Sequence, residues 1–248
     1  MQSLPRSKVL PESVTLEKPA TALASLTTTD AMRVLSDSVI SQWKRVAVFE
    51  RLSKHGIYPI RNVLMYGPPG NGKTTACQWL AGCLDAPLYR VRCEALVSSA
   101  LGGSAKSMHE TMQFLANAGK SVVLFDEVES IFPSRANNDD SCSRELASSM
   151  TVFWQMIDRW TSPQLFCYAT NMPETLDPAL MSRFELKLQF DPPTPEQKLS
   201  VLEYWSEVLH EFSPDLWASE LAALEYESFR ELWQCIADRV RHIAISKE

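Results

Sequence analysis

The chain has 248 residues, a formal net charge of −6 and 45% hydrophobic residues, which is enough for one α/β core plus a small accessory unit. This acidic balance argues against a protein that coats nucleic acid, because such proteins carry a basic face. The N-terminal residues lack an apolar segment of signal-peptide length, and no apolar run reaches the ~18–20 residues of a membrane span. We therefore expect a cytoplasmic protein with no membrane contact.

The cysteines show no metal-binding pattern. Six are present, with no CxxC pair and no histidine at ligand spacing beside them. Such a pattern predicts reduced, mostly buried thiols, not a zinc site.

Residues 1–30 are rich in Ser, Thr and Pro, which predicts a flexible N-terminal arm or an extended strap. Residues 31–190 are predicted to form a large domain that begins with a helix over 31–55. We expect strands at 62–66, 88–91, 122–125, 165–169 and 186–190, and helices at 73–84, 104–117 and 143–160. Strands that alternate with helices predict an αβα sandwich around a five-stranded, mainly parallel sheet.

The turn-rich segment that starts at Asp191 marks a predicted boundary, and residues 191–248 are predicted to form a small all-helical domain. This domain contains twelve Asp or Glu residues and five Lys or Arg residues, a net charge of −7. The charge fits either a solvated helical surface or a docking face for a basic partner or a neighbouring subunit.

The segment 67–74, GPPGNGKT, fits the phosphate-binding pattern GxxxxGK[ST] between a predicted strand and a predicted helix. Gly70 and Gly72 allow backbone N–H groups to converge on phosphate oxygens, and the helix N-terminus favours the same negative charge. Lys73 would contact the β- and γ-phosphates of ATP, and Thr74 would bind Mg²⁺. The predicted ATP-binding residues are Gly67, Pro68, Pro69, Gly70, Asn71, Gly72, Lys73, Thr74 and Thr75.

Two further predicted strands end in polar side chains. Asp126 and Glu127 follow the apolar run 122–125, and the carboxyl ends of central parallel strands face the ligand crevice. We expect Asp126 to hold the Mg²⁺ shell and Glu127 to orient and deprotonate the attacking water. Asn171 follows the strand at 165–169 and could bind the attacking water or the γ-phosphate.

Together these motifs resemble the AAA branch of the AAA+ ATPases, strongly over 56–190 and weakly over 191–248. The resemblance rests on GPPGNGKTT at 67–75, LFDEVESIFPSR at 124–135, ATN at 169–171, LDPALMSRF at 176–184 and PPTPEQK at 192–198. The helix from Ser228 resembles the last helix of the family's lid domain. The small, stand-alone bacterial type gives the nearest match.

The resemblance implies a catalytic set of Lys73, Asp126, Glu127, Asn171 and Arg183. Arg183 matches the arginine finger, which reaches a nucleotide held by the next subunit and stabilises negative charge in the transition state. The family therefore implies a homo-oligomeric ring, a hexamer, that acts on a protein partner.

Other positions bear on the contacts between subunits and on the loop that contacts polypeptide in family members that thread it. Arg135, Arg144 and Glu145 match positions near the subunit junction. Family members that thread polypeptide place an aromatic residue in a loop where this chain has Ala100, and Gly103 replaces the usual glutamate. Alanine cannot grip a passing chain as an aromatic ring does, which argues against threading. The lid shows no evident arginine for sensing nucleotide.

Two functions remain open at this point. The first is an AAA+ ATPase that remodels a protein partner. The second is an ATP-switched oligomeric scaffold that gates a separate protease or nuclease and hydrolyses ATP slowly, which the altered loop and the acidic lid favour. A nucleic-acid translocase is disfavoured by the overall acidity, and a P-loop kinase would not need Arg183 from a neighbour.

Overall fold

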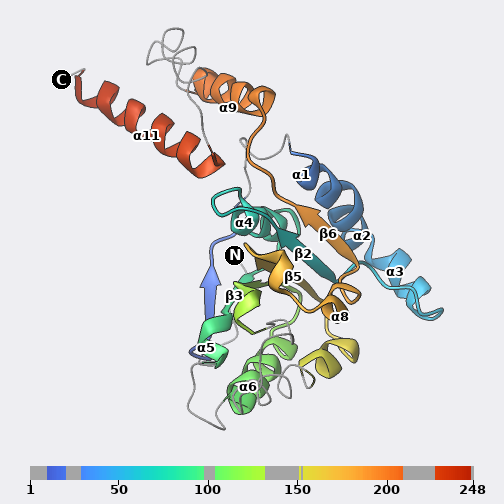
Figure 1. The fold of residues 1–248 in the computed structure, drawn as a ribbon. Helices are drawn as coiled ribbons and strands as arrows, with labels where there is room; N and C mark the ends of the chain where they lie inside the picture. Colours follow the sequence, from blue (N-terminus) through green and yellow to red (C-terminus); the bar gives the residue numbers. More distant parts are fainter. Residues whose placement is uncertain are drawn as a thin grey trace.

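The computed structural model describes residues 10–20, 29–97, 104–131, 151, 153–208 and 227–246. The strands are β1 (Val14–Glu17), β2 (Asn62–Tyr66), β3 (Leu88–Arg92), β4 (Ser121–Asp126), β5 (Gln164–Thr170) and β6 (Leu186–Gln189). The helices discussed below are α1 (Asp30–Val34), η1 (Leu35–Ile40), α2 (Ser41–Trp43), α3 (Val46–Ser53), α4 (Lys73–Cys83), α5 (Cys93–Val97), α6 (Ser104–Ala116), α8 (Pro178–Met181), α9 (Pro195–Val208) and α11 (Phe229–Ser246). Figure 1 shows the sheet at the centre of the molecule, with α9 and α11 extending beyond α4.

Within the described residues the sheet has six strands in the order β1-β3-β4-β5-β2-β6, so the predicted number of five is wrong. Five strands are parallel as predicted, and β1 adds to the edge antiparallel to β3. The extra strand falls inside the predicted N-terminal arm. Its sequence, VTLE, alternates apolar and polar residues over only four positions, which is a weak strand signal in a segment rich in Ser, Thr and Pro. These residues form a strand because they pair with β3, and the local sequence does not reveal that pairing.

The central strands are apolar throughout because both faces of the sheet are covered. On β4, Val122 and Leu124 belong to the core shared with α4, whereas Val123 and Phe125 belong to the core shared with α6. The two cores also separate the helices, since α1 and η1 pack on the α4 side and α5 and α8 on the α6 side. These layers confirm the predicted αβα arrangement.

The predicted continuous helix over 31–55 is interrupted in the structure. α1, η1 and α2 run on to Trp43, and α3 then starts at Val46. The interruption coincides with an anchor, because Trp43 Nε1 donates to the Ile60 carbonyl at 2.7 Å and Ile60 N donates to Gln42 Oε1 at 2.9 Å. These bonds hold the helix end against the segment that enters β2.

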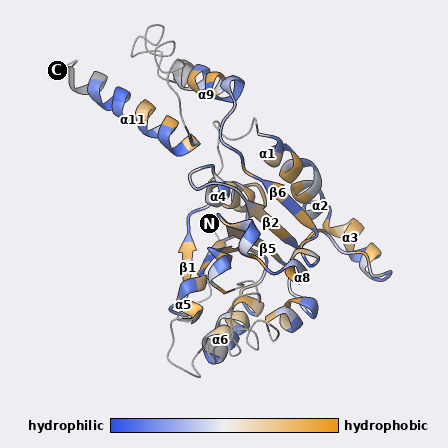
Figure 2. Cartoon of the chain, in the orientation of Figure 1, coloured by the Kyte–Doolittle hydropathy of each residue, from blue (hydrophilic) through white to orange (hydrophobic). Residues whose placement is uncertain are grey.

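Two described helices form the C-terminal part of the chain. α9 begins with a capping box, in which Thr194 N donates to Gln197 Oε1 and Gln197 N donates to Thr194 Oγ1. α9 and α11 meet through Trp205 and Trp233, whose ring centroids lie 4.7 Å apart. Both helices carry hydrophobic and hydrophilic residues, as Figure 2 shows. The predicted division at residue 190 stays a prediction.

The cysteines of the described residues carry free thiols that are buried or half-buried. Within the described ranges, Cys77, Cys93 and Cys167 are buried free thiols, and Cys83 and Cys235 are half-buried. Cys142 lies outside those ranges. No helix in the described part of the chain has the length and apolar character needed to cross a membrane.

Candidate nucleotide-binding site

Three central strands bring all the predicted site residues except Arg183 to one edge of the sheet. β5 lies between β4 and β2, with Ala169 paired to Asp126 and Thr170 paired to Tyr66. The residues that follow these strands, Glu127, Asn171 and Gly67, therefore emerge side by side at the carboxyl edge. Ligands of open α/β sheets bind at this edge.

The loop between β2 and α4 has a backbone that only glycine adopts readily. Gly67, Gly70 and Gly72 have φ angles of +139°, +83° and +91°. A Cβ at Gly67 would lie 2.3 Å from the Phe190 carbonyl oxygen, which no side chain tolerates. The glycines thus let the loop pass close to the end of β6 while turning into α4.

Lys73 points back into this loop from the first turn of α4. Its Nζ donates to the carbonyl oxygens of Gly67 at 2.7 Å and Pro68 at 2.9 Å. Desolvation lowers the pKa of Lys73, while the charges of Asp126 and Glu129 act in the opposite direction. The ammonium group is therefore buried inside the loop and within electrostatic reach of the acidic end of β4.

The acidic pair occupies the end of β4 as predicted. The Asp126 side chain is 18% exposed, and its Oδ2 accepts a hydrogen bond from Arg90 at 2.6 Å. Glu127 is exposed and has a left-handed backbone, with φ 55° and ψ 50°. Such a conformation is costly for a residue with a side chain and is concentrated at functional sites.

The start of α11 contacts the loop, and no local sequence pattern predicts this contact. Arg230 N donates to the Gly70 carbonyl at 3.1 Å, and Phe229 N donates to Asn71 Oδ1 at 3.3 Å. A Cβ at Gly70 would lie 3.1 Å from Cβ of both Arg230 and Ser228. The Arg230 charge also contributes to lowering the pKa of Lys73. The first turn of α11 thus places Arg230 beside the phosphate loop, whereas the expectation that no arginine of this region senses nucleotide stays a prediction.

Asn171 and Arg183 lie in different places relative to this loop. Asn171 is exposed at the carboxyl edge, directly after β5. Arg183 precedes β6, and the nearby Glu185 carboxylate accepts from the backbone N–H groups of Arg61 and Asn62 at the start of β2. The amino and carboxyl ends of the five-residue β2 are about 13 Å apart at ~3.3 Å per residue step. Arg183 is therefore not brought to the chain's own loop.

Arg183 has its own surroundings at the amino edge. Its guanidinium carbon lies 5.6 Å from the centroid of the Trp154 ring, and its Nε lies 3.9 Å from Asp158 Oδ2. The side chain is 40% exposed, so it remains accessible to a second molecule. The other predicted junction residues, Arg135, Arg144 and Glu145, and the loop positions Ala100 and Gly103 lie outside the described residues.

The donors and acceptors present fit ATP and Mg²⁺. Asn71 Nδ2 is a buried donor with no hydrogen-bond partner, located in the loop that would hold phosphate. Thr74 and Thr75 are half-buried in the first turn of α4. No cluster of three or more His, Cys, Asp or Glu side chains suited to a metal occurs among the described residues. Mg²⁺ is commonly bound through one or two carboxylates together with substrate phosphates, which matches a site with Asp126.

A glycine loop that follows β2 and opens a helix at the carboxyl edge of a parallel sheet, with acids at the end of β4 on the far side of β5, defines a P-loop nucleoside triphosphatase fold. The family described as "ATPase family associated with various cellular activities (AAA)" matches residues 63–192, slightly more than half of the chain. The chain belongs to this AAA family of ATPases.

Related proteins and structures agree with this assignment. The chain is 28% identical over 178 residues to the 26S proteasome regulatory subunit 10B homolog A of Arabidopsis thaliana, covering 70% of this chain and 44% of that protein. It is 30% identical over 199 residues to an uncharacterized AAA family ATPase of Sinorhizobium fredii, covering 80% and 58%. The crystal structure of the FIGL-1 AAA domain in complex with ADP is similar with a TM-score of 0.62 at 24% identity, covering 79% of this chain and 64% of that one. The chain spans about half the length of the curated relatives it matches.

Proposed function

We propose that this chain hydrolyses ATP with Mg²⁺ at the interfaces of a homo-oligomeric ring and uses the energy to remodel a protein partner. The proposal rests on one observation, which is that the site residues and Arg183 lie at opposite edges of the sheet. Lys73, Asp126 and Glu127 share the carboxyl edge of the sheet, whereas the exposed Arg183 lies at the amino edge. A site that needs Arg183 must therefore receive it from another subunit.

Each residue has a distinct task in this reaction. The backbone N–H groups of the loop and the Lys73 ammonium hold the phosphate oxygens, and Asn171 orients the attacking water. Glu127 takes a proton from that water as its oxygen bonds to the γ-phosphorus and the bond to the ADP oxygen breaks. Thr74 and Asp126 would hold Mg²⁺, which neutralises charge on the phosphates. The products are ADP and inorganic phosphate.

Arg183 acts in trans and links hydrolysis to assembly. A cation placed against the γ-phosphate by a neighbour stabilises the transition-state charge and is worth about 10³–10⁵ in kcat for known arginine fingers. An isolated subunit would therefore bind ATP and turn it over slowly. The exposure of Arg183 and its loose 3.9 Å ion pair with Asp158 leave it free to change partner.

A subunit-mixing experiment tests the proposal. Arg183→Ala leaves a subunit with an intact site and no finger, whereas Glu127→Gln leaves an intact finger and a dead site. Each variant alone should lose nearly all ATP hydrolysis, and mixing the two should recover part of it, because mixed interfaces combine an intact site with an intact finger. Arg159→Ala removes another exposed arginine of the same region and should keep wild-type activity.

The outcome of mixing decides between clear alternatives. Hydrolysis that stays absent in the mixture, or full activity of Arg183→Ala in a monomer, contradicts a finger in trans.

The replacement of the loop aromatic by Ala100 favours a second function, an ATP-switched scaffold that gates a separate effector protein. That function predicts ATP-dependent assembly of the wild type with slow turnover, and stimulation when the effector is added.

A further inference from the structure

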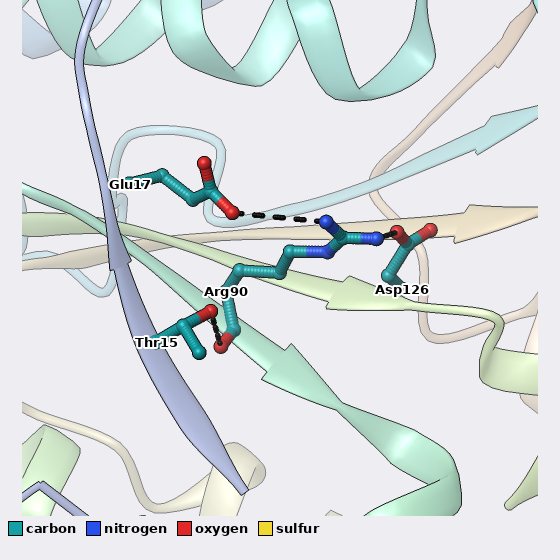
Figure 3. Close-up of polar contacts among 4 residues, drawn as sticks. All are labelled: Thr15, Glu17, Arg90 and Asp126. Carbon is teal, nitrogen blue, oxygen red and sulfur yellow. Dashed lines mark hydrogen bonds and ion pairs between the residues drawn. The ribbon is translucent and has the colours of Figure 1, made fainter.

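An ion-pair chain runs from the N-terminal strand to the acid of β4. Arg90, on β3, donates from one terminal nitrogen to Asp126 Oδ2 at 2.6 Å, and its other terminal nitrogen lies 3.7 Å from Glu17 Oε1 on β1. Figure 3 shows the guanidinium lying between the two carboxylates. The arrangement joins three neighbouring strands of the sheet.

The register of the sheet produces this arrangement. Arg90 pairs with Thr15 on β1 and with Leu124 on β4, so its side chain shares a face with the residues two positions further on, Glu17 and Asp126. Thr15 Oγ1 also donates to the Arg90 carbonyl at 3.4 Å (Figure 3). The contact thus depends on β1 being paired to the edge of the sheet.

The two ion pairs of Arg90 differ in strength. The Arg90–Asp126 bond is short and charge-assisted, and it joins an Arg90 side chain that is 39% exposed to an Asp126 side chain that is 18% exposed. Glu17 is 27% exposed and 3.7 Å away, so its pair with Arg90 is the weaker one. Arg90 therefore fixes Asp126, and Glu17 steadies Arg90.

We propose that Arg90 is a positioning residue for the metal carboxylate Asp126, and that Glu17 of β1 holds Arg90 in place. Arg90 occupies Oδ2 and restrains rotation of the carboxylate, and Oδ1 would be available to hold Mg²⁺. This inference rests on the proposed role of Asp126 in Mg²⁺ binding. It makes β1, which lies before the part of the chain matched by the family, a component of the ATPase site.

The direction in which the metal affinity changes distinguishes a positioning role of Arg90 from a purely electrostatic one. Removing a cation from beside a metal site strengthens divalent binding if charge alone matters. Removing the partner that orients a metal carboxylate weakens it, commonly 10–100-fold. A purely structural role of Arg90 would lower stability and leave the metal affinity unchanged.

Metal binding is measured directly with Mn²⁺. Electron paramagnetic resonance gives the dissociation constant of Mn²⁺ from the full chain bound to a non-hydrolysable ATP analogue, and nucleotide binding is measured separately in EDTA. Arg90→Gln should weaken Mn²⁺ binding about tenfold or more. Glu17→Gln should weaken it in the same direction but less. Neither change should alter nucleotide binding in EDTA.

Arg92→Gln is the matched control, because Arg92 lies on the same strand and pairs with Asp126 in the register but donates to the Glu12 carbonyl. It removes the same charge and should leave Mn²⁺ binding unchanged. Arg90→Lys keeps the charge without the forked donor geometry and should give an intermediate affinity. It also carries the test if Arg90→Gln fails to fold.

The outcomes distinguish the two proposals. Mn²⁺ affinity that is unchanged or higher in Arg90→Gln, or in Arg90→Lys if the former does not fold, overturns the positioning role. If Asp126→Asn weakens Mn²⁺ binding while the Arg90 variant does not, only the positioning role fails. If Asp126→Asn itself leaves Mn²⁺ binding unchanged, the metal role of Asp126 fails and the positioning role fails with it.

Discussion

The backbone N–H of Arg230 donates to the carbonyl oxygen of Gly70, which joins the first turn of α11 to the middle of the phosphate loop. The Arg230 side chain is exposed there, and its charge acts on Lys73. The first turn of α11 is thus held to the loop through its backbone, because Phe229 N also donates to Asn71 Oδ1 at 3.3 Å.

Arg230→Ala should weaken ATP binding about tenfold, because a charge-assisted hydrogen bond contributes about 1.5–3 kcal/mol. Fluorescence titration with a labelled nucleotide gives the dissociation constant. Arg241→Ala serves as the control, since Arg241 lies on the same helix and makes only an exposed ion pair with Asp238. Equal affinities for both variants would show that Arg230 does not contact the nucleotide.

Gly67→Ala should destabilise the protein by at least about 3 kcal/mol, from left-handed backbone strain and a clash that cannot relax. The clash is with backbone, because the added Cβ would lie 2.3 Å from the Phe190 carbonyl oxygen. Gly119→Ala is the matched control, because Gly119 also has a positive φ but no atom within 4 Å of the added Cβ. It should cost about 1–2 kcal/mol. Urea denaturation measures both, and similar losses would contradict the close approach of the loop to β6.

The strands that the sequence predicts well are those buried on both faces. The run 62–66 matches β2, and 122–125 lies inside β4, because continuous apolar residues mark a central parallel strand without knowledge of its partners. β1 could not be found in this way, since only Val14 of its four residues is buried. The break after Trp43 was missed for a similar reason, because its bond to the Ile60 carbonyl joins segments 17 residues apart.

The candidate site divides along the same line. Lys73 and the pair Asp126–Glu127 could be predicted because each sits in a contiguous motif whose position next to a strand fixes its location. Arg90 and Arg230 could not. Arg90 and Asp126 are 36 residues apart in the sequence and meet because of the register of the sheet. Arg230 lies at the loop because α11 packs there, and the bond from Phe229 to Asn71 joins residues 158 positions apart. An arginine inside the strand LYRVR was the single local signal for Arg90.

Asp85→Gly should stabilise the protein by about 0.5–1 kcal/mol. Asp85 follows the end of α4 with φ 47°, in a Schellman arrangement where Ala86 N donates to the Ala81 carbonyl and Asp85 N to the Gly82 carbonyl. Glycine adopts this conformation without strain. Thermal unfolding should show a higher midpoint with unchanged ATP hydrolysis, because Asp85 lies at the other end of α4 from the phosphate loop. A lower midpoint would show that the aspartate side chain stabilises this turn.

The buried ammonium of Lys73 should make stability depend on pH in a defined direction. Desolvation lowers the pKa of Lys73 below 10.5, so the folded protein releases this proton at a lower pH than the unfolded chain does. Between the lowered pKa and 10.5 the unfolded state binds more protons, and the free energy of unfolding contributed by this group rises with pH. Lys73→Met lacks the group and lacks this rise.

The stability of the wild type relative to Lys73→Met should therefore increase as pH rises toward 10.5 in urea denaturation without nucleotide. Lys73→Arg keeps its charge over this range and bears the burial cost throughout, so the wild type should also gain on it as pH rises. A difference that is constant with pH would show that the attraction of Asp126 and Glu129 offsets desolvation, and one that falls with pH would show that it outweighs desolvation. The Lys73 ammonium would then be stabilised by the acidic strand end even before phosphate reaches it.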